Sequence, residues 1–296
     1  MLEIIKQELI DNNEDYIVTK NGEVIFRSND KLSLEFSNNV DLKVIHIIDK
    51  DTKISYKVKK NINIKLSEVF YDLKNSPIIE IEFNLEEGSK FDYTSLRRSG
   101  TVQDIKAIVN AYVKSYAYLN YKTLTTHVGD GTIDENFHLE NERALVDVKN
   151  VLINTSKKKQ DFNVNIYHNA KNTISNLLNY GICKNESYLT INSKGIIIQG
   201  AHKAEIRQRA KGLLLDEYSV LSANPLLEID DFDVIANHGA SIGAIDEDEL
   251  YYLMSRGLTK DESEKLIVAG FINPVLAEVK EGKFQDYCLA WINSNL

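Results

Sequence analysis

Apolar and polar residues alternate at every second position over most of the chain. Clear examples are Ile54, Tyr56 and Val58, then Ile79, Ile81 and Phe83, and later Phe162, Val164 and Ile166. A period of two predicts a β-strand that buries one face, because successive side chains point to opposite sides of a sheet. Asparagine, aspartate, glycine or serine interrupts the alternation roughly every eight to twelve positions, as turns between short strands do. We therefore predict a mainly β core over residues 16–245.

The strand pattern continues without long helical crossovers, which leaves a sandwich, a barrel or a solenoid of stacked strands. No strict repeat period is visible. Asparagines near the predicted strand ends favour the solenoid slightly, since stacked turns let side-chain amides bond to their neighbours. At any single position, a solvent-facing turn residue is the simpler interpretation. The asparagines concerned are Asn61, Asn63, Asn165, Asn169, Asn172, Asn176 and Asn192.

Residues 101–123 fit two patterns. Ile105, Ala107 and Val109 alternate at period two, whereas Ile105, Ile108 and Tyr112 also fall near one face of a helix. We favour strands here, in keeping with the segments on either side.

The last fifty residues change to a helical pattern. Asp246 followed by Glu249 resembles a capping box, and Gly257 supplies a stop. Leu250, Leu253 and Met254 then share one face of this first helix.

A second helix is predicted by the same start and stop signals. Thr259 and Glu262 form its capping box, and Gly270 ends it. We expect a third helix to begin near Pro274, because proline is tolerated in a first helical turn. A fourth is expected over residues 284–292. The chain thus divides into a short N-terminal helix (1–15), the β core (16–245) and a C-terminal helical domain (246–296).

Composition narrows the function without identifying it. The 296 residues are 43% hydrophobic, and 35 Lys and Arg against 44 Asp and Glu give a net charge of -9. An acidic chain is not attracted to nucleic acid or to anionic membranes, so we expect neither as a partner. The first ten residues read as an amphipathic helix and not as a leader, and no apolar window is long enough to cross a bilayer. A cytoplasmic location is expected.

Familiar catalytic signatures are missing from the sequence. There is no phosphate-binding glycine loop, no dinucleotide fingerprint, no H-E-x-x-H and no G-x-S-x-G, so we expect no phosphate-binding cradle in this chain. The six histidines show no metal-ligand spacing. Cys183 and Cys288 belong to no C-x-x-C pair. Cys183 is a candidate sulfur or iron ligand, although a small buried apolar residue is the more common role.

Residues 223–276 closely resemble the C-terminal signature of the SufB/SufD family of iron–sulfur cluster assembly scaffold proteins. Upstream, His168, Thr173 and Ser175 match a family turn, and Gln208 followed by a leucine run matches the stretch before the acidic strand. The matching C-terminal elements are Pro225–Ile229, His238–Asp246, Leu250–Leu258, and Gly270 with Phe271.

The resemblance implies a right-handed parallel β-helix that acts as a non-catalytic scaffold of the SUF system. It implies pairing through the C-terminal turns of the β-helix, either with a second copy or with a SufB-type subunit. The C-terminal helices would dock SufC, an ABC-type ATPase, so this chain would bind no nucleotide itself. The candidate docking residues are Leu250, Leu253, Met254, Arg256, Leu266 and Phe271.

By the same resemblance, His238 lies at the subunit interface and is the candidate contact for iron or a transient iron–sulfur cluster. Two departures point towards the SufD branch. Gly239 stands where SufB-type chains carry glutamate, and Ala210 where they carry a sulfur-accepting cysteine. The short chain instead resembles a minimal form that works as a homodimer.

One alternative from another class stays open, a β-helical carbohydrate-active enzyme. Such enzymes need clustered carboxylates on one strand face. The candidates are Glu228, Asp230, Asp231 and Asp233.

Overall fold

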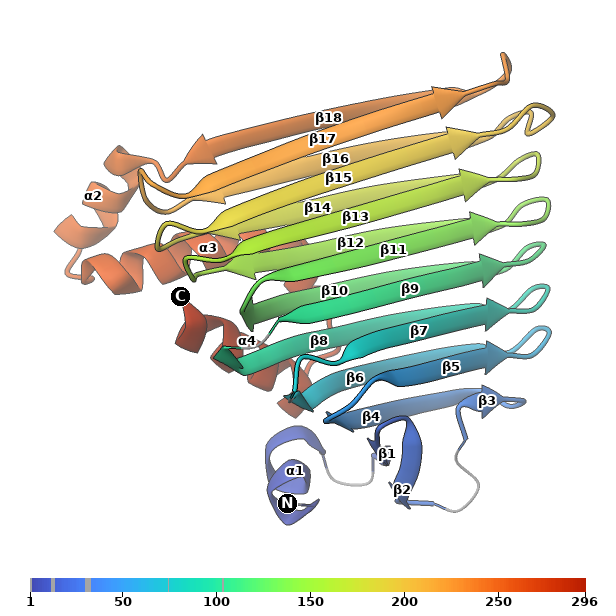
Figure 1. Cartoon of the computed structure of the whole chain (residues 1–296), viewed down its shortest axis with the longest axis horizontal. Coiled ribbons are helices and arrows are strands. Elements are labelled where there is room, and N and C mark those ends of the chain that lie inside the picture. Colours follow the sequence, from blue (N-terminus) through green and yellow to red (C-terminus); the bar gives the residue numbers. More distant parts are fainter. Residues whose placement is uncertain (1, 12–13, 30–32, 74, 103) are drawn as a thin grey trace.

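A computed structural model describes residues 2–11, 14–29, 33–73, 75–102 and 104–296. The chain winds into a parallel β-solenoid of about eight turns, in which two facing sheets enclose a narrow lumen (Figure 1). Each turn contributes one strand to each sheet, and helices lie along one flank. The predicted parallel β-helix is therefore confirmed.

We call the two sheets A and B. Sheet A contains, in spatial order, β18 (Ile235–Ala244), β16 (Glu205–Leu214), β14 (Ile174–Cys183), β12 (Leu145–Asn154), β10 (Tyr118–Val128), β8 (Lys90–Val102), β6 (Asn63–Leu73), β4 (Val40–Ile48), β1 (Asp15–Lys20) and β2 (Glu23–Arg27). Sheet B contains β17 (Val220–Ile229), β15 (Tyr188–Ile197), β13 (Lys159–His168), β11 (Gly131–Leu139), β9 (Ile105–Val113), β7 (Ile78–Leu85), β5 (Thr52–Val58) and β3 (Glu35–Phe36).

Parallel pairing in register sets the position of every side chain. Tyr118 aligns with Leu145, Leu145 with Ile174, Ile174 with Glu205, and Glu205 with Ile235, so these four turns take 27 to 31 residues each. This variable turn length explains why no strict period is visible in the sequence. In the segment that fitted two patterns, β9 and the start of β10 are strands as predicted, and Ala107, Val109 and Ala111 of β9 point into the lumen.

Asparagine ladders run across the outer face of sheet B. The amide of Asn192 donates to Asn163 at 2.8 Å, that of Asn224 to Asn192 at 3.0 Å, and that of Asn165 to Asn136 at 3.0 Å. The stacking prediction is correct at these mid-strand positions. Asn61 and Asn172 instead adopt positive φ angles of 61° and 59°, as turn residues do.

Four helices occur in the described residues: α1 (Leu2–Leu9), α2 (Glu247–Ser255), α3 (Lys260–Leu276) and α4 (Lys283–Asn295). The outer face of sheet A and helices α3 and α4 share one apolar cluster, in which Val268, Ile272 and Cys288 meet side chains such as Val151 and Ile182. The helices thus cover part of sheet A and leave the outer face of sheet B open.

The predicted helix boundaries near Gly270 and Pro274 are wrong. Helix α3 continues through both residues to Leu276, so three helices, not four, follow the β core in the described chain. Proline inside a helix costs about 3 kcal/mol. Burial of Ile272 and Val275 against sheet A, at about 1.5–3 kcal/mol for each side chain, offsets that cost. The Thr259–Glu262 capping box is confirmed.

Arg98 fixes helix α4 to sheet A. Its guanidinium carbon lies 4.3 Å from the ring centre of Trp291, 4.7 Å from that of Tyr71 and 5.4 Å from that of Tyr287. The indole of Trp291 also donates a 2.5 Å hydrogen bond to the Thr126 hydroxyl on β10. Stacking of Arg against several rings stabilises the helix where it crosses the sheet.

A buried carboxylate lies inside the lumen near the N-terminal end. Glu68 is fully buried and accepts hydrogen bonds from Tyr56, Tyr93 and Ser95, and its carboxylate lies 3.1 Å from Nε2 of His46. Burial by itself raises the pKa of Glu68. The bonds from His46 and the tyrosines outweigh burial, so the pKa falls below the ordinary value of 4.5.

We predict that Glu68→Gln lowers the free energy of unfolding at pH 7 by about 3 kcal/mol, because its amide N–H faces groups that are themselves donors. A lowered folded pKa means that the contribution of Glu68 is complete above pH 4.5 and disappears as the pH falls through the folded pKa. The difference in the free energy of unfolding between the wild-type protein and the variant should therefore become smaller below pH 4.5. Urea unfolding, measured from pH 7 to below pH 4.5, gives this difference.

Glu87→Gln is the matched control. Glu87 forms an exposed ion pair with Lys60 at 2.9 Å, and its replacement should change stability by less than about 0.5 kcal/mol. A Glu68→Gln variant as stable as this control would contradict the prediction.

Candidate functional site at the open end of the solenoid

The C-terminal end of the solenoid has no covering turn. Strands β18 and β17 pair with a neighbour on one side only, so both sheets end in a free edge (Figure 1). Large apolar side chains remain exposed there, among them Leu226, Ile229, Phe232, Ile235 and Ile242. An uncovered apolar surface of this kind is typical of an interaction site.

His238 lies at the mouth of the lumen. It aligns with Gln208, whose side chain points inward, so His238 points to the same side one turn further out. It is exposed because no turn follows. The resemblance placed His238 at an interface, and this position is compatible with that role.

Gln208 is the polar residue next to His238 within the lumen. Its side chain is buried, yet neither its amide nitrogen nor its amide oxygen has a partner. Gly195 on β15 provides the necessary space, since a Cβ at that position would lie 2.7 Å from the Gln208 nitrogen. In the sequence, Gln208 is marked only by its match to the family, and no local pattern indicates that its amide is unpaired.

His168, Thr173 and Ser175 meet as one buried group. The Thr173 hydroxyl donates to the Ala170 carbonyl, so it accepts from His168 Nδ1 at 2.7 Å, and Nε2 then accepts from the Ser175 hydroxyl at 2.8 Å. Burial lowers the pKa of His168 to about 3. His168 is therefore a neutral structural histidine that holds its turn.

Cys183 does not approach His238. It aligns with Leu214 and then Ala244, six residues along β18 from His238, a separation of roughly 20 Å. Its thiol is fully buried, and burial raises its pKa to about 11. Cys288 lies on α4 and is buried between that helix and the rest of the protein. A protonated, enclosed thiol is a poor metal ligand.

Within the described part of the chain, no three His, Cys, Asp or Glu side chains gather closely enough to hold a metal ion. His238 can therefore supply one ligand but not a complete site. Any iron or cluster handled there would need further ligands from another molecule.

Two of the four acidic residues suggested for carbohydrate chemistry, Glu228 and Asp231, have structural roles. Glu228 forms an ion pair with Lys194 at 2.7 Å. Asp231 accepts hydrogen bonds from the backbone N–H groups of Asp233 and Gly200, which lower its pKa and fix the turn before β18.

Two apolar grooves flank helix α2. Leu253, Leu266 and Phe271 line a groove of about 400 Å³ together with Leu213 of β16. Leu250 lines a second groove of about 340 Å³. Of the other predicted docking residues, Met254 is exposed and Arg256 stacks on the ring of Tyr252 at 5.1 Å. Three of the six predicted residues thus share one groove.

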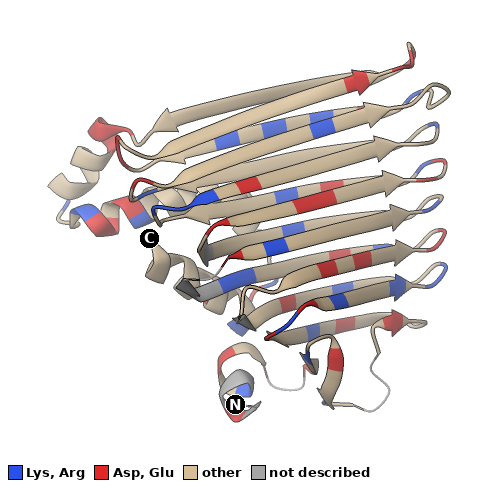
Figure 2. Ribbon diagram, viewed as in Figure 1, with Lys and Arg blue, Asp and Glu red and all other residues tan. Residues whose placement is uncertain are grey.

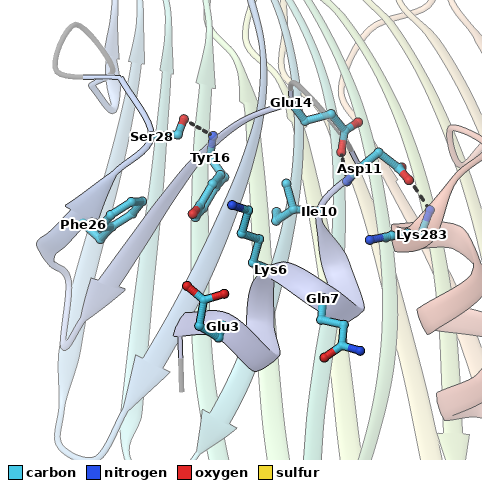
Figure 3. Close-up of a pocket in the computed structure, with 10 residues that line it drawn as sticks. All are labelled: Glu3, Lys6, Gln7, Ile10, Asp11, Glu14, Tyr16, Phe26, Ser28 and Lys283. Atoms are coloured by element: carbon cyan, nitrogen blue, oxygen red, sulfur yellow. Dashed lines mark hydrogen bonds between the residues drawn. The ribbon is translucent and has the colours of Figure 1, made fainter.

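A larger pocket of about 720 Å³ lies at the opposite end, beside α1 (Figure 3). Two of its carboxylates accept hydrogen bonds from the backbone. Glu14 accepts from the Asp11 N–H at 2.9 Å, and Asp11 accepts from the Lys283 N–H at 3.1 Å. These contacts join α1, the first strand and α4, so we assign them to the N-terminal cap.

The solenoid, its open end and the helical flank define a parallel β-helix protein with one uncovered end. The chain belongs to the SufBD family, because the family "SUF system FeS cluster assembly, SufBD core domain" matches residues 47–271. Family membership favours the SUF scaffold over the carbohydrate-active alternative.

Similar proteins agree with this family. The chain is 38% identical over 154 residues to the iron–sulfur cluster assembly protein SufD of Bacillus subtilis, covering 51% of this chain and 35% of that protein. It is 30% identical over 138 residues to a SufBD family protein of Mycobacterium bovis, covering 47% and 16% of the two chains. The matches therefore span about a third or less of these relatives. In the described residues, no helix is both long enough and apolar enough to cross a membrane.

Proposed function

We propose that this protein is a non-catalytic scaffold of the SUF system. It pairs through the edge of β18, docks a SufC-type ABC ATPase on α2 and α3, and offers His238 to iron or to a cluster that is the cargo of the machinery. The observation that carries the proposal is the free edge of β18 beside His238 at the open mouth.

The two free edges differ in their hydrogen-bonding capacity. On β18 the N–H groups of Ile235 and of the following residue Ile245 donate back towards β16, so the alternate residues, Ala240 among them, direct their N–H groups to the free edge. On β17 the same alternation directs the nitrogen of Pro225 to the free edge, where it has no hydrogen to donate. The β18 edge is therefore the better one for pairing with another chain.

Antiparallel pairing of two β18 strands about a two-fold axis at Ala240 would use all the edge-facing groups. Both lumens would then face each other across the axis. The two His238 residues would lie about 14 Å apart, which is too far to bridge one iron. Each His238 therefore acts as a single ligand.

We predict that Ala240→Pro converts the dimer to a monomer, because it removes a donor at the free edge and leaves the bonds to β16 intact. Size-exclusion chromatography with light scattering measures the mass. Ala223→Pro is the control, since its N–H faces the other free edge. A dimer that survives Ala240→Pro would contradict pairing through β18.

The apolar groove supports ATPase docking. Leu266 is 52% exposed, so a polar residue there should not affect the fold. We predict that Leu266→Asp abolishes co-elution with the SufC-type ATPase of the same genome, because it places a charge in the groove. Ile25→Asp is the control, at an apolar side chain 54% exposed at the far end. Equal co-elution of both variants would rule out this groove.

We predict that His238→Ala lowers the iron retained after anaerobic reconstitution with ferrous iron and sulfide by more than half. The reason is the loss of the one imidazole at the mouth. His202→Ala, at an exposed turn histidine, controls for adventitious binding. Iron content measured after gel filtration, if unchanged by His238→Ala, would leave the protein as an adaptor without cluster contact.

A further inference from the structure

Three cations lie in a row on the outer face of sheet A. Arg207, Arg209 and Lys211 occupy alternate positions of β16, and all three side chains are exposed. Figure 2 shows blue bands along this strand near the open end. The net charge of the chain is -9, so a cationic row stands out against an acidic background.

Two of these charges are not neutralised. Arg207 pairs with Glu205 at 2.6 Å. Arg209 and Lys211 form no ion pair within the described chain, and the Lys211 ammonium instead lies 5.9 Å from the ring centre of Tyr180. Exposed cations without partners are available to carboxylates of another molecule.

The row continues the apolar groove beside α2. Leu213, the next outward position on β16, lines that groove, and from Leu213 to Arg207 the row extends for roughly 20 Å. The ring of Phe271, also in the groove, packs edge-on against Tyr180 at 5.1 Å between ring centres. Groove and row therefore form one continuous surface.

Strand β18 leaves this surface open to approach. Beside Arg207, Arg209 and Lys211 it carries Asn237, Gly239 and Ser241, and Gly243 follows beside Leu213. Added Cβ atoms at both glycines would meet nothing within 4 Å. A peptide segment can therefore lie along the cations without meeting a bulky side chain.

We propose that the partner that fills the groove carries carboxylates next to its apolar anchor, and that Arg209 and Lys211 bind them. This inference rests on the proposed docking of the ATPase and specifies the chemistry of its contact segment. Asp246 and Glu249 line the groove on the α2 side. The groove is therefore acidic at one end and basic at the other, which fixes the direction of the segment, because a reversed segment would meet like charges.

The test compares Arg209→Glu/Lys211→Glu with Lys106→Glu/Lys114→Glu, a control of equal charge change at exposed lysines on and just beyond β9 of sheet B. Titration calorimetry with the SufC-type ATPase measures Kd at low and high salt. We expect the first variant to bind about tenfold or more weakly and to lose most of the salt dependence, with the control unchanged. Equal Kd values for both variants and the wild-type protein would overturn the inference while leaving docking intact.

A second measurement identifies the carboxylates directly. A carbodiimide joins an amine to a carboxylate without a spacer, so Lys211 in the wild-type complex should cross-link to an Asp or Glu of the ATPase, which mass spectrometry identifies. Lys211→Arg should bind normally and lose this cross-link. A wild-type complex without any cross-link at Lys211 would overturn the inference. A wild-type chain that does not bind the ATPase at all would refute docking itself.

Discussion

Parallel pairing in register is the constraint on which the whole molecule depends. Each side chain in the lumen stands directly on the equivalent side chain of the next turn, about 4.8 Å away. An apolar position must therefore find apolar neighbours above and below, and a polar one must find its hydrogen-bond partners on adjacent turns. On the outer face of sheet B, the asparagine side chains likewise find their hydrogen-bond partners on adjacent turns.

The polar groups of the lumen meet this condition almost everywhere. Glu135 accepts from Arg97 at 3.0 Å and from Asn150 at 3.1 Å, and Asn150 in turn donates to Asn179 at 3.0 Å. This series of hydrogen-bonded side chains ends before Gln208, whose amide is unpaired, and before His238, which is exposed. Single buried atoms of Arg97 and Thr125 also have no partner, but in Gln208 both atoms of the amide are unpaired.

Sequence alone could predict the strands and the β-helix, because alternation is local and the C-terminal signature of residues 223–276 is specific. It could not place the helix ends correctly. Pro274 and Gly270 are local stop signals, and burial of Ile272 against a distant sheet overrides them. The same limit applies to the site. The lengths of the turns decide that Cys183 lies far from His238 and that Arg209 lies in line with the groove. No sequence motif encodes these turn lengths.

The two ends of the solenoid differ in a way that limits how large an assembly can grow. At the N-terminal end, the short strand β2 closes sheet A by antiparallel pairing and carries Glu23 and Arg27. The opposite end offers the β18 edge with its regularly spaced donors. In the proposed pairing, a contact between two identical ends would use both of them, so sheet addition would close at two chains and would not propagate into a filament. Stacked strands of this kind form fibres when both ends can add further chains. In this molecule the two ends differ, and that difference limits the addition of chains.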